Sequence, residues 1–223
     1  MGRLYLDFDE GVPQYVFTGC SRCGSLMGSS LNNIKNRGCC SYFPEFYLID
    51  VHRMSKTLEG LHTLENILRH PGAVVHPYHI HVKGTFDTKG YEEFTKSGAF
   101  PETGDIRDKT VFFRTCPFVK SGQGCTLPSR YRNYVCNMFI CDEVLKSACV
   151  QETINQYLEE RSRYVRWIEW ENSSLRRTLQ EHGISLSTGF MQAVEILQSV
   201  PLNTYQFAQL EPVETTYFQF IVV

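Results

Sequence analysis

Apolar residues occur in short uninterrupted runs over the first part of the chain, and each run is bounded by turn-forming residues. Leu4-Tyr5-Leu6 and Tyr15-Val16-Phe17, for example, flank the turn sequence Gly11-Val12-Pro13. Runs of this length that are rich in β-branched and aromatic residues predict short strands. The predicted strands cover residues 4–6, 15–17, 74–75, 80–82, 111–113, 205–207 and 217–223.

From residue 48 onward, long stretches carry a helical repeat instead. Leu48, Val51, Met54 and Leu58 recur at the spacing of a helix with one buried face. The same repeat predicts helices over 48–58, 61–69, 143–182 and 186–197, with Gly183 in a C-cap position after the third. Residues 19–40, 83–109 and 116–141 lack the repeat and are predicted to be loops. The second of them is expected to be an exposed excursion, and the third has room for one turn of helix.

Together the two patterns predict an α+β fold. Short strands and loops would make up residues 1–142, and a mainly helical region would follow at 143–223, as a second unit or as part of one domain. The C-terminal helices are expected to pack against the first region and to supply its core.

Composition places the chain among ordinary globular proteins. Of its 223 residues, 42% are hydrophobic and 21% are charged, and the formal net charge is -2. Neither a nucleic acid nor a membrane surface is therefore expected as a partner. No apolar segment has the length of a signal peptide or a membrane span, so the expected location is the cytoplasm.

The nine cysteines change this picture. Four lie within residues 20–40, five lie within 116–149, and none lies between or after these groups. Without a secretory signal they are expected to be reduced, and clustered reduced cysteines favour a metal site. Cys149 sits beside Ala148 and Val150 in a helical stretch, and it is predicted to be a packed core residue rather than a ligand.

The spacing of the other eight cysteines is that of a metal-binding framework. Cys20-Ser-Arg-Cys23 places two sulfurs on one turn, and the adjacent pair Cys39-Cys40 follows after fifteen residues. Successive side chains point apart, so Cys39 and Cys40 would either divide between ligation and packing or serve different metals. The remaining four candidate ligands are Cys116, Cys125, Cys136 and Cys141.

These elements resemble the YkgJ-like cysteine-cluster family, which is described as a zinc- or iron-chelating domain. The resemblance covers roughly residues 15–145. It rests on the Cys-x-x-Cys and Cys-Cys elements, on Cys116-Pro-Phe-Val, and on the segment that runs from Cys125 to Cys141. It implies that the eight cysteines bind the metal. Flagellin lysine methylases share this framework, which implies a methyltransferase-like enzyme as one alternative.

The irregular spacing favours an iron–sulfur cluster, preferably of the 4Fe–4S type, over zinc. Zinc ribbons usually supply two Cys-x-x-Cys pairs, whereas this chain has one. Bridging sulfides separate the ligands of an iron–sulfur cluster, so irregular spacing is tolerated. The function hypothesis is a metal-binding protein that supports redox chemistry or the modification of a protein or peptide. The other alternative is a structural zinc module that presents an interaction surface.

Two further groups of side chains are candidates. Arg130 and Arg132 lie between Cys125 and Cys136, where they would offset thiolate charge, hold an anionic cofactor or substrate, or belong to an ordinary solvated face. His76, His79 and His81 form the histidine cluster, and His79 and His81 would share one face of a strand. A metal site there is possible in principle, but ordinary strand and turn histidines are the favoured interpretation.

Overall fold

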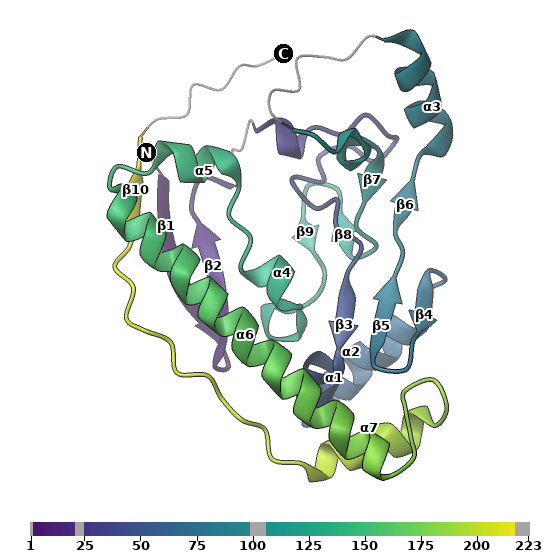
Figure 1. Ribbon diagram of the computed structural model, residues 1–223. Helices are drawn as coiled ribbons and strands as arrows, with labels where there is room; N and C mark the ends of the chain where they lie inside the picture. The colour runs from purple at the N-terminus through teal and green to yellow at the C-terminus, as the bar shows by residue number, and fades with distance from the viewer. Residues whose placement is uncertain (1, 21–24, 99–105, 217–223) are drawn as a thin grey trace.

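The computed structural model describes residues 2–20, 25–98 and 106–216, and it has an α+β architecture of small antiparallel sheets and packed helices (Figure 1). The first sheet has the strand order β10-β1-β2. β1 (Gly2–Asp9) and β2 (Val12–Phe17) form the predicted hairpin. Its two turn residues, Glu10 and Gly11, both have positive φ, as the tightest hairpin turns require.

The third strand of this sheet comes from the other end of the chain. β10 (Val213–Thr215) pairs with β1 in the register Gly2↔Thr215. The buried Thr215 hydroxyl accepts from the Gly2 N–H and donates to the Gly2 carbonyl. The strand predicted at 205–207 is wrong, because these residues have no regular secondary structure. The strand predicted at 217–223 lies outside the described residues.

The second sheet, β3-β5-β4, carries the larger core. β3 (Glu45–Tyr47), β5 (His79–Val82) and β4 (Ala73–Val75) are antiparallel. Phe46, Ile80 and Val82 are fully buried on one face. α1 (Leu48–Ser55) and α2 (Leu58–Leu68) pack on that face and lie behind the sheet in Figure 1.

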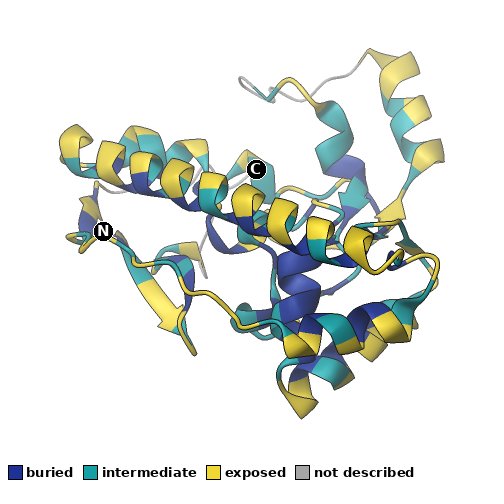
Figure 2. Cartoon of the chain, turned by 60° about the horizontal axis from the view of Figure 1, so that its bottom comes forward, coloured by how far each residue is buried: buried dark blue, intermediate teal, exposed yellow. Residues whose placement is uncertain are grey.

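The C-terminal helices cover the same core. α6 (Gln151–Glu181) runs diagonally across the molecule, and α7 (Phe190–Ser199) returns beneath it to contact α1. Figure 2 shows that α6 is exposed on its outer side and buried toward the rest of the chain. One continuous hydrophobic core joins residues from both halves of the sequence.

An extended segment, residues 200–212, follows α6 back toward the first sheet. Two buried carboxylates of α6 hold it in place. Glu160 accepts from the Ala208 N–H, and Glu171 accepts from the side-chain amide of Asn203. Below we call residues 200–212 the C-terminal strap.

Short elements fill the segments that were predicted to be loops. They are η2 (Leu26–Gly28), β6 (Thr85–Phe86), α3 (Thr88–Ser97), η3 (Lys109–Phe113), β7 (Arg114–Thr115), β8 (Val119–Lys120), β9 (Gly124–Cys125), η4 (Ser129–Tyr131) and α4 (Tyr134–Asn137). The strand predicted at 111–113 is therefore wrong, because this run forms most of a 3-10 helix. Its Phe113 ring packs against Tyr91 and Phe94 of α3.

The long helix predicted at 143–182 is interrupted. α5 (Asp142–Ser147) and α6 are separated by residues 148–150, because the Cys149 N–H donates to the carbonyl of Glu214 in β10. Cys149 is exposed, which corrects the prediction of a packed core residue. α6 ends as expected before Gly183, and α7 begins at Phe190 rather than at 186. In the described part of the chain, no helix combines the length and apolar character needed to cross a bilayer.

Candidate metal centre

The two cysteine groups, separated by some seventy-five residues of sequence, meet at Cys40. The Cys116 N–H donates to the Cys40 carbonyl over 3.0 Å. Neighbouring residues fasten the same two segments, since the buried Asn32 side chain donates to the Thr115 hydroxyl over 2.8 Å. These bonds place the first cysteine loop beside the strand that leads into the second group.

The second group surrounds this point. Cys125 lies on β9 and pairs in register with Val119 of β8, whose N–H donates to the Cys116 carbonyl. Cys136 lies on α4, where its N–H donates to the side chain of the helix N-cap, Asn133. Asn133 is fully buried and also donates to the Glu45 carbonyl, which fixes α4 against β3.

Cys141 belongs to a different neighbourhood, near the start of the first cysteine loop. It is the N-cap residue of α5. In the first turn of this helix, Glu143 accepts from the Ser25 hydroxyl over 2.5 Å. Ser25, at the far side of the first Cys-x-x-Cys element from Cys20, is thereby held close to Cys141 at the start of α5. Cys23 lies outside the described residues.

Electrostatic interactions divide the thiols in the same way. The pKa of Cys39 is raised by Cys40, Cys20 and Cys141, whereas the pKa of Cys136 is raised by Cys116, Cys125 and Cys40. Two neighbourhoods therefore adjoin at the Cys39-Cys40 pair. The adjacent side chains serve one neighbourhood each.

The Cys39-Cys40 pair also ionises unequally. A hydrogen bond from the Cys39 thiol, with smaller contributions from Arg132 and Arg37, lowers the pKa of Cys40 to about 7 against the cost of its burial. The same hydrogen bond raises the pKa of Cys39. Burial raises the pKa of Cys116 to about 12. Without a cation the neutral thiol is therefore favoured at most of these positions.

Arg37 is the site residue that the sequence analysis missed. Its side chain is 2% exposed, and its guanidinium donates to the carbonyls of Gly38, Ser29 and Val111 over 2.5, 2.8 and 2.7 Å. It forms no ion pair with a carboxylate of the described residues. Burial lowers the pKa of Arg37, and the neighbouring thiols of Cys39 and Cys40 act in the opposite direction. A buried cation without a carboxylate partner needs negative charge nearby.

The two candidate arginines separate in the structure. Arg132 donates to the Leu127 carbonyl over 2.9 Å, and its charge acts on Cys40, Cys116 and Cys136. Arg130 is committed elsewhere, since it pairs with Asp9 over 2.9 Å and with Glu59 over 2.5 Å. Arg130 thus joins the first hairpin to α2 rather than facing the thiols.

Cysteine thiols have the right chemistry to bind a soft or borderline metal. In this structure the described thiols do not surround one common point. The eight described cysteines are thiols that are not part of disulfides. No three His, Cys, Asp or Glu side chains in residues 2–20, 25–98 and 106–216 are already arranged to hold one ion. Clustered cysteine thiols beside a buried guanidinium nevertheless suit zinc or an iron–sulfur cluster.

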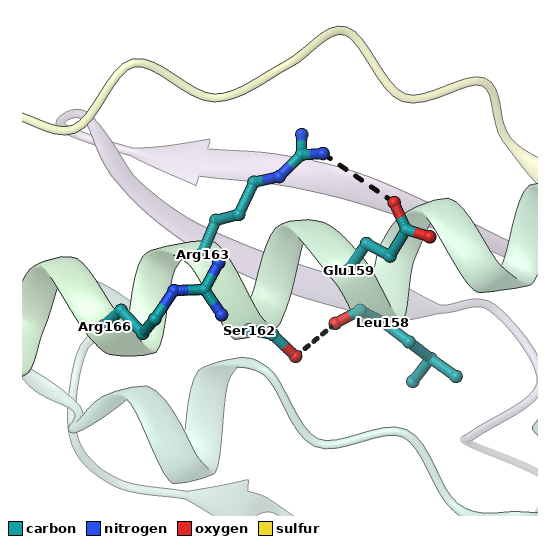
Figure 3. A pocket seen from close by; sticks show the side chains of 5 residues that line it. All are labelled: Leu158, Glu159, Ser162, Arg163 and Arg166. Atoms are coloured by element: carbon teal, nitrogen blue, oxygen red, sulfur yellow. Dashed lines mark hydrogen bonds and ion pairs between the residues drawn. The ribbon is translucent and has the colours of Figure 1, made fainter.

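An open depression on the surface contains no cysteine or histidine. It is lined by α6 residues only (Figure 3). Arg163 in its wall pairs with Glu159 over 3.7 Å, and the Ser162 hydroxyl donates to the Leu158 carbonyl over 2.9 Å. These are the contacts of a salt-bridged helix exterior.

Comparison with protein-family models, with curated proteins and with solved structures gave no significant match.

Proposed function

We propose that the chain is a metal-binding cysteine-cluster protein that holds an iron–sulfur cluster or zinc through its clustered thiolates. The observation that carries this proposal is the meeting of two sequence-distant cysteine groups at Cys40. Packing alone does not account for this arrangement, because Cys20, Cys39 and Cys136 are exposed. Metal ligation does account for it.

We assign the eight thiolates to two adjoining sets of four. One set is Cys40, Cys116, Cys125 and Cys136. The other is Cys20, Cys39 and Cys141 with Cys23, which is assigned on its Cys-x-x-Cys spacing to Cys20. Three observations support this division. Cys39 and Cys40 interact with different thiols, the Cys116 N–H donates to Cys40, and the Ser25 hydroxyl donates to Glu143 near Cys141.

Charge supports ligation by thiolates rather than storage of neutral thiols. Four thiolates around Zn²⁺ or around a 4Fe–4S cluster leave net negative charge on the centre. Arg37 on the first-loop side and Arg132 on the other side are placed to offset it. The buried Arg37 then has the counter-charge that the described carboxylates do not give it.

Exposure favours a reactive centre over a closed structural one. Cys20, Cys39 and Cys136 keep solvent-accessible surface, whereas a structural zinc site is a closed four-ligand shell. We therefore favour an iron–sulfur centre that exchanges electrons or supports the modification of a protein or peptide. Cysteines that are not part of disulfides fit a reducing compartment, and we propose the cytoplasm.

The test is metal and acid-labile sulfide analysis of anaerobically purified protein, together with its absorption spectrum. We expect iron and sulfide in comparable amounts and a broad visible absorption that dithionite bleaches. Zinc without sulfide would replace the iron–sulfur assignment by the structural zinc alternative. A metal-free protein with bridged cysteines would refute metal binding altogether.

Single serine variants test the division into sets. Cys116→Ser and Cys136→Ser should lower the metal content of one centre and leave the centre that contains Cys141 loaded. Cys149→Ser is the matched control, because Cys149 is an exposed thiol outside both sets, and its metal content should equal that of the wild type. Equal losses in Cys149→Ser and Cys116→Ser would contradict the assignment.

A further inference from the structure

The face of the β3-β5-β4 sheet opposite the core carries a histidine cluster. Side chains alternate between the two faces of a strand. Ile80 and Val82 point into the core, so His79 and His81 lie on the opposite face. On the neighbouring β3, Glu45 lies opposite His81 and Tyr47 lies opposite His79. All four side chains are half-buried, and α1 and α2 lie on the other side of the sheet (Figure 1).

The ring nitrogens distinguish this cluster from the other histidines. The remaining four histidine rings each have a polar partner. These pairs are His52 with the Val200 carbonyl, His62 with Glu65, His70 with the Gly72 N–H, and His182 with the Thr178 carbonyl. The rings of His76, His79 and His81 form no hydrogen bond or ion pair with any of the described residues. Their nitrogen lone pairs are therefore available to an external ligand.

We propose that His79 and His81 chelate a borderline transition-metal ion of the zinc, cobalt or nickel class, at a site distinct from the cysteine centre. Neutral imidazole is a preferred ligand for these ions. Residues two apart on a strand project in the same direction, which is the geometry a two-point chelate needs. The proposal does not depend on the cysteine assignment, because none of its ligands is a thiol.

Glu45 offers a further donor on the neighbouring strand. It faces His81 across the sheet, and one of its carboxylate oxygens accepts from the Tyr47 hydroxyl over 2.6 Å. Hydrogen bonds of this kind orient the carboxylate ligands of metal ions. Because no three described donors already surround one point, water would complete the coordination shell. The site is thus an open one.

His76 acts through His79 rather than on the metal. The two rings are stacked, with centroids 4.4 Å apart and planes 13° apart. Parallel rings at this spacing do not point their nitrogens at one ion, so His76 limits the rotation of the His79 ring. It is a positioning residue in this proposal.

The test is a Co²⁺ or Ni²⁺ titration of the anaerobically purified full chain, followed by calorimetry and absorption. The wild type should bind one equivalent without a thiolate-to-metal charge-transfer band. In His79→Ala/His81→Ala the affinity for this ion should fall by more than the roughly 10–100-fold that loss of an outer-shell partner costs. In Glu45→Gln the affinity should fall by less. His62→Ala/His182→Ala is the matched control, since both rings have other partners, and it should bind like the wild type.

Two results would overturn the proposal. One is unchanged binding in His79→Ala/His81→Ala with a folded circular-dichroism spectrum. The other is loss of the equivalent in Cys116→Ser/Cys136→Ser accompanied by loss of a charge-transfer band, which would place the ion on sulfur. The two proposals can be told apart. If the purified protein contains no metal on its cysteines but still binds one Co²⁺ or Ni²⁺ ion through His79 and His81, only the proposed function is refuted.

Discussion

Asp50 gives the most quantitative prediction. Its carboxylate is 4% exposed near the start of α1, accepts from the Tyr47 N–H over 2.9 Å and lies 3.8 Å from Arg53. Burial outweighs the effects of Arg53 and of this hydrogen bond, and it raises the pKa of Asp50 from 3.8 to about 6. The difference corresponds to about 3 kcal/mol at most.

The sign follows from proton binding. Between pH 3.8 and about 6 the folded protein binds more protons at Asp50 than the unfolded chain does. The contribution of this group to the free energy of unfolding therefore falls as pH rises through that window. Asp50→Asn removes the titration and keeps the shape and an oxygen acceptor for the Tyr47 N–H.

Denaturant unfolding measured by tryptophan fluorescence provides the assay, because Trp167 and Trp170 both lie on α6. The stability of Asp50→Asn relative to the wild type should rise by up to about 3 kcal/mol between the two ends of the window. Any constant cost of the amide cancels in this difference. Asp142→Asn, at an exposed position, sets the change that a surface carboxylate produces. A relative stability that is flat or falls with pH would refute the reasoning.

Three further predictions concern the candidate metal centre, the end of α7 and the C-terminal strap. Arg37→Met should reduce the metal bound per chain and destabilise the loaded protein, whereas Arg37→Lys, which keeps the charge, should retain more metal; equal losses would remove the electrostatic role. Lys56→Met should lower the free energy of unfolding by roughly 1–3 kcal/mol, because the ammonium caps the last carbonyls of α7, and chemical denaturation measures this. Glu160→Ala should accelerate amide hydrogen exchange at Ala208 and along the C-terminal strap; unchanged exchange there would contradict the anchoring role.

The sequence was most informative where a periodic pattern and a local stop signal agreed. The first hairpin, α1, α2 and the end of α6 at Gly183 follow from apolar spacing and turn residues alone. Residues 111–113 show the limit of this reasoning. An apolar run of three fits either a strand or a 3-10 turn, and the choice here was made by contacts of Phe113 with α3.

Non-local pairing explains the other differences. The break before α6 exists because Cys149 bonds to Glu214, a residue from the far end of the chain that no local pattern reveals. At the candidate centre, the clustering of the cysteines could be predicted from their spacing. The burial of Arg37 could not, because it lies in an aperiodic Gly-, Ser- and Asn-rich loop. A charged residue next to a Cys-Cys pair was the available signal.

The pairing of β1 with β10 also constrains the order in which the molecule can form. The Gly2–Thr215 contact joins residues 213 positions apart, so β1 emerges from the ribosome long before its partner. During synthesis the free edge of β1 exposes unpaired backbone groups, which favours association between chains. All eight candidate ligand cysteines lie at or before residue 141, so the ribosome makes them well before β10. A nascent chain can therefore present the whole proposed ligand set while the first sheet is still open, and closure by β10 would come last.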